Sequence, residues 1–221
     1  MPVEPAWKKW ARRVWSLGYS RLFMVLAILA SLIALATPMW AVTQTDGADW
    51  TTQAYGIFGR SADEYVDGAF NQLIYQPYAG PTFRQHTLAA AVGASFGLIV
   101  VYAVVLAIVV ALFSMEWAKT MPRLGLLIIT IFVVLVALAA LFYPILTVPN
   151  AAAADFSTPA MGGGFWGSTT TPDTFNWGAG LAWWLLLIAV ILGAVGVALP
   201  YLQSMRGTPY PPPPQAWHPQ Q

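Results

Sequence analysis

The sequence contains no cysteine among its 221 residues, and only 9% of those residues are charged. The lack of cysteine excludes disulfide bonds in the segments outside a membrane, and it excludes thiolate chemistry. The scarcity of charge is unusual, because soluble domains carry about 25% charged residues. We therefore expect a lipid bilayer, rather than water, to be the main solvent of this chain.

Four long apolar segments account for the low charge. A bilayer crossing takes about 20 apolar residues, and a helix satisfies its own backbone hydrogen bonds in lipid. Neither acidic residues nor Lys, Arg or His occur in the four expected transmembrane helices, which are Leu22–Val42, Thr87–Met115, Leu124–Val148 and Gly178–Ser204. They make residues 22–204 a four-helix transmembrane domain with external loops 43–86 and 149–177, between an N-terminal segment 1–21 and a tail 205–221.

The positive charges predict the orientation of the bundle. Eight cations lie on one side of the predicted helices: Lys8, Lys9, Arg12, Arg13, Arg21, Lys119, Arg123 and Arg206. Only Arg60 and Arg84 lie on the other side. The positive-inside rule then predicts a multi-pass protein of the plasma membrane with both termini in the cytoplasm. An alternative interpretation takes residues 1–36 as a secretory signal, but the apolar run continues to Val42.

The segment Ala6–Gly18 has the pattern of a short amphipathic helix. Tryptophans gather on or beside one of its faces and cations on the other, which is typical of a helix lying at a membrane surface. The membrane-interface residues that we expect are Trp7, Lys8, Lys9, Trp10, Arg12, Arg13 and Trp15. The alternative is a basic flank that only orients the first helix.

The tail after the fourth helix contains four consecutive prolines, Pro211–Pro214. Such a run favours a polyproline II rod, which either docks in an aromatic groove or belongs to a disordered terminus.

A short pattern occurs twice along the chain. Pro38 and Pro144 each lie near the expected outer end of a helix, and they are followed by the similar stretches Gly56–Ser61 and Gly164–Ser168. Two helix–loop–helix halves of one orientation would form a parallel repeat. Since prolines at helix ends and glycines in loops are common, coincidence is the alternative.

The first loop is rich in residues that favour strands. Trp50–Phe58 and Phe70–Tyr78 contain many Thr, Tyr, Ile and Phe residues. We predict an all-α membrane bundle with a small extracellular β-sheet, formed mainly by the first loop and completed by the second loop or by a neighbouring subunit. The aromatic residues that we expect to bind a partner are Trp50, Tyr55, Phe58, Tyr65, Phe70, Tyr75, Tyr78, Phe165 and Trp166.

Small residues within the helices suggest close packing. Gly93 and Gly97 form a Gly-x-x-x-Gly pair, and Gly193 with Gly196 suggests a second seam. These seams serve contacts within the bundle or between subunits.

Candidates for chemistry are few. Asp63, Glu64 and Asp67 offer oxygen ligands for Ca²⁺, but the glycine-bearing calcium-loop pattern is missing, so we interpret them as a solvated acidic patch. His86 has no second histidine spaced with it and fits a helix entrance. We therefore expect no catalytic residues, no cofactor and no metal.

The layout resembles the claudin and peripheral-myelin-protein superfamily. The similarity rests on four helices, a long first external loop, and Trp50 followed by Gly56–Phe58, similar to that family's Trp followed by Gly-Leu-Trp. The family's two cysteines are missing here, so any paracellular-pore role is not implied. The resemblance implies a cell-contact protein or an accessory subunit.

Together these features predict a non-catalytic membrane protein that acts through its aromatic external loops in a structural, cell-contact or accessory role. Its expected partners are the bilayer and either further copies of itself or other membrane subunits. No basic patch suggests nucleic acid. The alternative function is a scaffold subunit of a larger transport or energy-converting complex, whose active groups lie on other chains.

Overall fold

The structure, a computed structural model, describes residues 18–115, 121–170 and 174–205. The predicted membrane-interface helix, with Trp7, Lys8, Lys9, Trp10, Arg12, Arg13 and Trp15, lies outside these residues, and so does the tail from residue 206.

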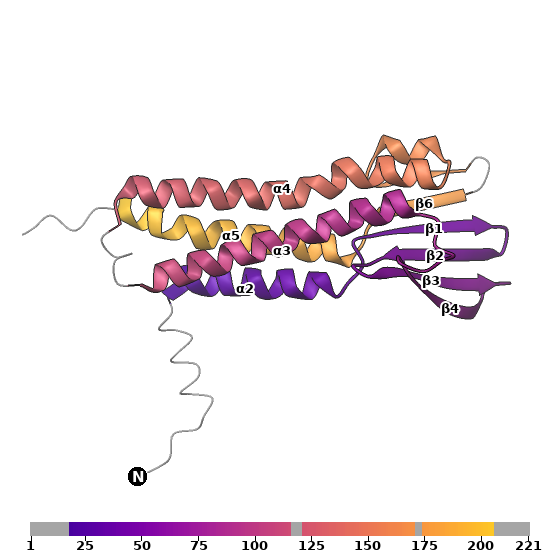
Figure 1. Cartoon of the computed structure of the whole chain (residues 1–221), viewed down its shortest axis with the longest axis horizontal. Coiled ribbons are helices and arrows are strands. Elements are labelled where there is room, and N and C mark those ends of the chain that lie inside the picture. Colours follow the sequence, from indigo (N-terminus) through magenta and orange to yellow (C-terminus); the bar gives the residue numbers. More distant parts are fainter. Residues whose placement is uncertain (1–17, 116–120, 171–173, 206–221) are drawn as a thin grey trace, which may run out of the picture.

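Four long helices lie side by side as a bundle (Figure 1). They are α2 (Gly18–Leu35), α3 (His86–Ser114), α4 (Arg123–Asp155) and α5 (Leu181–Met205). Each is long and apolar enough to cross a membrane, and their outward-facing side chains are mainly Leu, Ile, Val and Phe. The prediction of a multi-pass membrane bundle is confirmed.

The predicted ends of two helices were wrong, because apolar residues continue from the helix into a buried strand. Helix α2 ends at Leu35 rather than at Val42, since Trp40–Val42 begins strand β1. Helix α5 begins at Leu181 rather than at Gly178, which lies in strand β6.

Helix α4 is longer than predicted. It passes through Pro144 and Pro149 and ends at Asp155 rather than at Val148. Each proline removes one backbone hydrogen bond, but the alanines at 151–154 are strong helix formers. Pro144 therefore lies inside a helix, whereas Pro38 lies after the end of α2, so the two prolines are not at equivalent positions.

A six-stranded antiparallel sheet extends from one end of the bundle (Figure 1). Its strands are β1 (Trp40–Asp46), β2 (Asp49–Tyr55), β3 (Gly59–Val66), β4 (Ala69–Pro77), β5 (Gly167–Thr169) and β6 (Thr174–Ala179). Their order in the sheet is β4-β3-β2-β1-β6-β5. The predicted strands in the first loop correspond to β2 and β4, whereas β1 and β3 were not predicted.

The second loop completes the sheet, which was one of the two predicted possibilities; the other was a neighbouring subunit. Strand β6 pairs with β1, with Thr43 opposite Asn176. Four strands thus come from the first loop and two from the second, so the sheet is larger than the small element expected in an all-α protein.

Backbone hydrogen bonds join the short connection between α2 and β1 to the start of α5. The Gly180 amide donates to the carbonyl of Met39 (2.8 Å), and the Ala182 amide donates to the carbonyl of Pro38 (2.9 Å). A Cβ on Gly180 would overlap the backbone of Pro38 and Met39, so glycine permits this close crossing. The end of α2 and the start of α5 are therefore fixed together where the sheet begins.

The surface of α3 and α4 changes character along their length. From Val100 to Ile108 the exposed side chains of α3 are mostly large and all apolar, whereas those between His86 and Gly97 are small or polar. Residues 97–114 of α3 span about 27 Å, close to the roughly 30 Å of a hydrocarbon core. The first turns of α3 and the last turns of α4 therefore stand beyond the apolar belt, beside the sheet.

Candidate interaction surface

The inner face of the sheet is covered and forms part of the core. Trp40, Tyr55 and Phe175 are all buried, in one core cluster with Met161 of the 3-10 helix Pro159–Gly163 and with residues at the ends of α3 and α4. The Trp40 Nε1 donates to the carbonyl of Phe165 at 3.2 Å and thereby joins the two loops. Tyr55 and Phe165, two of the predicted partner-binding aromatics, are buried here and do not reach the molecular surface.

A polar cluster lies on the same face toward β4. The Arg60 Nη1 donates to Gln53 Oε1 and its Nη2 donates to Gln76 Oε1, both at 2.7 Å. The Tyr55 hydroxyl donates to Gln53 Oε1 at 3.0 Å. Burial raises the pKa of Tyr55, and the Arg60 guanidinium offsets part of that increase. These hydrogen bonds hold three neighbouring strands together, and the buried Arg60 Nε is left without a hydrogen-bond partner among the described residues.

The opposite face of the sheet, called the open face below, has no helix over it within the described residues. Its far half carries the predicted partner-binding residues Trp50, Tyr65 and Phe70. The rings of Trp50 and Tyr65 stack at 4.6 Å, and Phe70 meets Tyr65 edge-on at 5.6 Å. Here the structure does bring predicted aromatic residues together.

Phe58 and Tyr75 lie at the end of the sheet nearest the bundle. They line a hollow of about 240 Å³ beside Leu35 and Pro38, and the Phe58 side chain is 76% exposed. Tyr78 is half-buried and donates its hydroxyl hydrogen to the Gly56 carbonyl at 2.7 Å, so it shapes this turn.

Trp166 belongs to a separate aromatic group beside β6 and the start of α5. Its ring contacts Trp183 edge-on at 5.1 Å, and it lies 6.5 Å from Trp184. Tryptophans of this kind are enriched at membrane–water boundaries. The predicted partner-binding aromatics therefore divide among the core, the open face and the edge of the apolar belt.

Strand β4 is the most exposed element of the sheet. Residues Ala69–Tyr75 are all exposed, and they include the aliphatic side chains Leu73 and Ile74, which sequence reasoning missed. Apolar and polar residues alternate only weakly along β4, because both faces of the strand reach the surface. This weak alternation is the sequence signal that would have indicated an edge strand. No charged side chain occurs within it.

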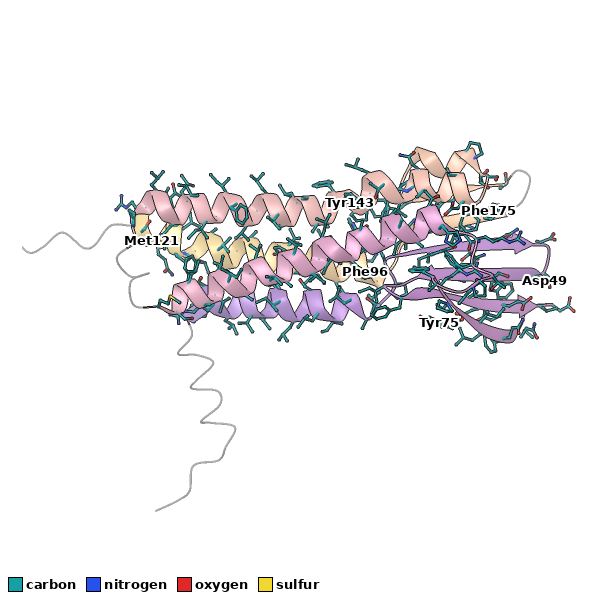
Figure 2. All side chains as sticks on the ribbon, in the orientation of Figure 1. Asp49, Tyr75, Phe96, Met121, Tyr143 and Phe175 are labelled. Atoms are coloured by element: carbon teal, nitrogen blue, oxygen red, sulfur yellow. The ribbon has the colours of Figure 1, made fainter. Side chains whose placement is uncertain are left out.

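The two ends of the sheet carry different charges. Asp46, Asp49 and Asp67 lie at the tip farthest from the helices, with Asp63 and Glu64 next to it on β3. Figure 2 shows Asp49 at this tip and Tyr75 nearer the helices. Arg60, on β3, is opposite Tyr55 near the helix end. The sheet is thus acidic at its far end and cationic nearer the bundle.

The predicted acidic candidates do not converge on a metal site. Glu64 accepts hydrogen bonds from Asn71 Nδ2 (3.3 Å) and from Gln72, whereas the Asp67 amide donates to Asp49 Oδ1 (2.8 Å). Across residues 18–115, 121–170 and 174–205, no group of three His, Asp or Glu side chains is placed to hold a metal ion.

The four predicted packing glycines behave in two ways. A Cβ on Gly193 would overlap the Tyr102 hydroxyl, and one on Gly196 would lie 2.7 Å from Met24 Cγ, so both glycines allow close helix contacts within the chain. A Cβ on Gly93 or Gly97 would meet no atom within 4 Å. The Gly-x-x-x-Gly pair is therefore not filled by the chain's own described helices.

No protein-family model matches the chain, and no curated protein matches it in sequence.

Proposed function

We propose that this is a non-catalytic membrane protein of the cell surface, whose sheet binds a neighbouring protein in a structural, cell-contact or accessory role. The observation that carries the proposal is the exposed edge strand β4, an uncharged nine-residue strand with Phe70, Leu73 and Ile74 at the surface. Monomeric soluble surfaces rarely leave such apolar edges uncovered.

The distribution of cations supports an outward-facing sheet. Arg21 and Arg123 lie at the start of α2 and α4, at the end of the bundle opposite the sheet. Six more cations flank the helices on this side in the sequence, against only Arg60 and Arg84 on the side of the sheet; the six are Lys8, Lys9, Arg12, Arg13, Lys119 and Arg206. Met121, two residues before Arg123, marks that end in Figure 2. The positive-inside rule assigns this end to the cytoplasm. The resemblance to the claudin superfamily favours the same cell-contact or accessory role.

A photo-crosslinking experiment tests the proposal. A photo-reactive phenylalanine analogue, introduced at Leu73 through an amber codon, should crosslink to protein in native membranes. The same analogue at Leu138, on the lipid-facing side of α4, should react mainly with lipid. Mass spectrometry identifies the adducts. A chain that runs as a monomer and gives no protein adduct from Leu73 contradicts the proposed function.

The orientation is tested separately, because the chain has no cysteine. A single Asp67→Cys variant in intact cells should react with a membrane-impermeant maleimide. Labelling only after the cells are opened would contradict an outward-facing sheet.

A second candidate function is a scaffold subunit of a larger membrane complex. It is favoured by a groove of about 650 Å³ between α3 and α4, lined by Ala94, Gly97, Phe142 and Leu146. The Gly93–Gly97 face of α3 beside this groove could pack closely against a transmembrane helix of another chain. Stable co-purification with a chain that carries transport or redox activity would favour this candidate.

A further inference from the structure

The sheet has two edges of different length. Strand β5 forms one edge with three residues, whereas β4 forms the other with nine. Within the described residues nothing pairs with the outer side of β4. Natural proteins usually block a long edge with charge, with an interior proline or with a cover. Strand β4 has no charge, its proline is its last residue, and its side chains are exposed, so it can accept another strand.

The direction of β4 limits how a second copy can pair with it. The strands run roughly along the bundle axis, and β4 runs from the far tip toward the helices (Figure 1). Two copies side by side in one membrane would place their β4 strands parallel. Two copies in facing membranes would place them antiparallel, the arrangement that continues the sheet's own pattern and is slightly more stable per residue.

The charges favour the antiparallel arrangement. The acidic residues of the sheet lie in its far half, including Asp49, Glu64 and Asp67, whereas Arg60 lies near the helix end. Parallel copies would set acidic half beside acidic half. Antiparallel copies set the acidic half of each sheet beside the cationic end of the other, which is favourable.

We infer that β4 pairs antiparallel with β4 of a second copy in a facing membrane, so that the two sheets join edge to edge. This inference rests on the proposed function and names its partner. Full overlap of Ala69–Pro77 places Leu73 at the centre, opposite its counterpart. Strands of this length overlap over about 30 Å, which sets the approximate gap between the two membranes.

Single-cysteine variants test the inference directly. Full-length Leu73→Cys protein is reconstituted into two liposome populations, each with a different affinity tag, and the populations are mixed under mild oxidation. Directly opposed residues of antiparallel strands lie about 4.5–5.5 Å apart at Cα, within disulfide range. The expected result is a disulfide-linked dimer that carries both tags. Ser168→Cys, on the short β5 edge, is the matched control and should give none.

Other outcomes are equally decisive. Dimers that carry only one tag would indicate pairing within one membrane and would overturn the inference, as would the absence of Leu73→Cys dimers. Equal yields from Ser168→Cys and Leu73→Cys would show unspecific contact and overturn it as well.

A charge variant provides an independent test. Leu73 is 63% exposed, so Leu73→Lys should leave the thermal midpoint unchanged while placing two like charges at the centre of the pairing. Liposome tethering, measured by light scattering, should fall at least tenfold, whereas Ser168→Lys should retain it. Undiminished tethering by Leu73→Lys overturns the inference. If tethering is absent even for the wild type while Leu73 still crosslinks to another protein in native membranes, only this inference fails and the proposed function stands.

Discussion

The Tyr102 side chain of α3 lies directly against Gly193 of α5. Its hydroxyl donates a hydrogen bond to the Ala189 carbonyl at 3.0 Å, and a Cβ on Gly193 would overlap that hydroxyl. Both residues are buried. This contact fixes the separation of two transmembrane helices in the middle of the bundle.

Gly193→Ala should destabilise the bundle by about 2 kcal/mol, because the added methyl group forces Tyr102 or α5 to move. Thermal unfolding in detergent measures the change. Gly97→Ala is the matched control, and it should be neutral or stabilising, since its methyl group enters open space and alanine favours helix. Tyr102→Phe added to Gly193→Ala should recover part of the loss. Equal destabilisation by both alanine variants would contradict the close contact.

Trp40→Phe should lower the free energy of unfolding by about 2–3 kcal/mol. The change leaves a cavity and removes the hydrogen bond from Trp40 Nε1 to the buried Phe165 carbonyl. Because this bond joins the two loops, proteolysis near residue 165 should also become faster. Trp50→Phe, a half-buried tryptophan that stacks on Tyr65, serves as the control and should cost clearly less. Equal losses in the free energy of unfolding for Trp40→Phe and Trp50→Phe would show that the hydrogen bond between the loops does not stabilise the fold.

Asp155→Ala should destabilise the sheet end of α3 by about 1 kcal/mol. The Asp155 Oδ2, at the end of α4, accepts the backbone N–H of Leu88 in the first turn of α3 at 2.7 Å, and a carboxylate at that position also favours the helix dipole. Hydrogen exchange at Leu88 should report the loss. Asp155→Asn should retain part of the protection, and Asp46→Ala, an exposed acidic control, should change nothing there. Unchanged exchange at Leu88 in Asp155→Ala would exclude this capping role.

Stability should decline above about pH 10 in a way that depends on Tyr55. Burial raises the pKa of this hydroxyl in the folded protein, so the unfolded chain releases the proton first as the pH rises. The stability that this pKa increase provides is fully present below the ordinary tyrosine pKa of about 10 and is lost as the pH rises above it. Tyr55→Phe should therefore be less stable at pH 7, because it lacks the bond to Gln53, yet lose less stability between pH 9 and 11.5.

Denaturant titrations in micelles across this pH range measure how steeply the free energy of unfolding falls with pH in Tyr55→Phe and in the wild type. Tyr75→Phe, which removes an exposed hydroxyl, is the matched control. The pKa of Tyr78 is raised in the same direction, mainly by burial, so Tyr55→Phe should retain some decline. Parallel curves for Tyr55→Phe and the wild type would contradict the role of Tyr55.

The sequence predicts the four helices well because lipid imposes a simple requirement, a long apolar run with no ionisable group. Their ends are predicted poorly for a physical reason. Trp40–Val42 and Trp177–Ala179 are as apolar as the helices, but they are buried in strands under a protein cover rather than in lipid. Composition alone does not distinguish these two environments.

The candidate surface was only partly predictable. Tyr55 on β2 and Tyr75 on β4 lie in strands of similar composition on either side of β3, yet Tyr55 is buried and Tyr75 is exposed. The difference arises because the segment around Met161 covers one face of the sheet, and because β4 is at the edge. Both features depend on tertiary structure and leave no pattern in the local sequence. Leu73 and Ile74 were therefore missed, and Phe165 was wrongly expected at the surface.

The bonds from Gly180 to Met39 and from Ala182 to Pro38 have a mechanical consequence. Tension applied at the far tip of the sheet would pass along β1 and β6 and load their hydrogen bonds in shear, the direction in which many bonds must break together. The force would then reach α2 and α5 through two adjacent chain crossings rather than through a flexible linker. A cell that pulled on this protein would therefore transmit the load straight to the opposite side of its membrane.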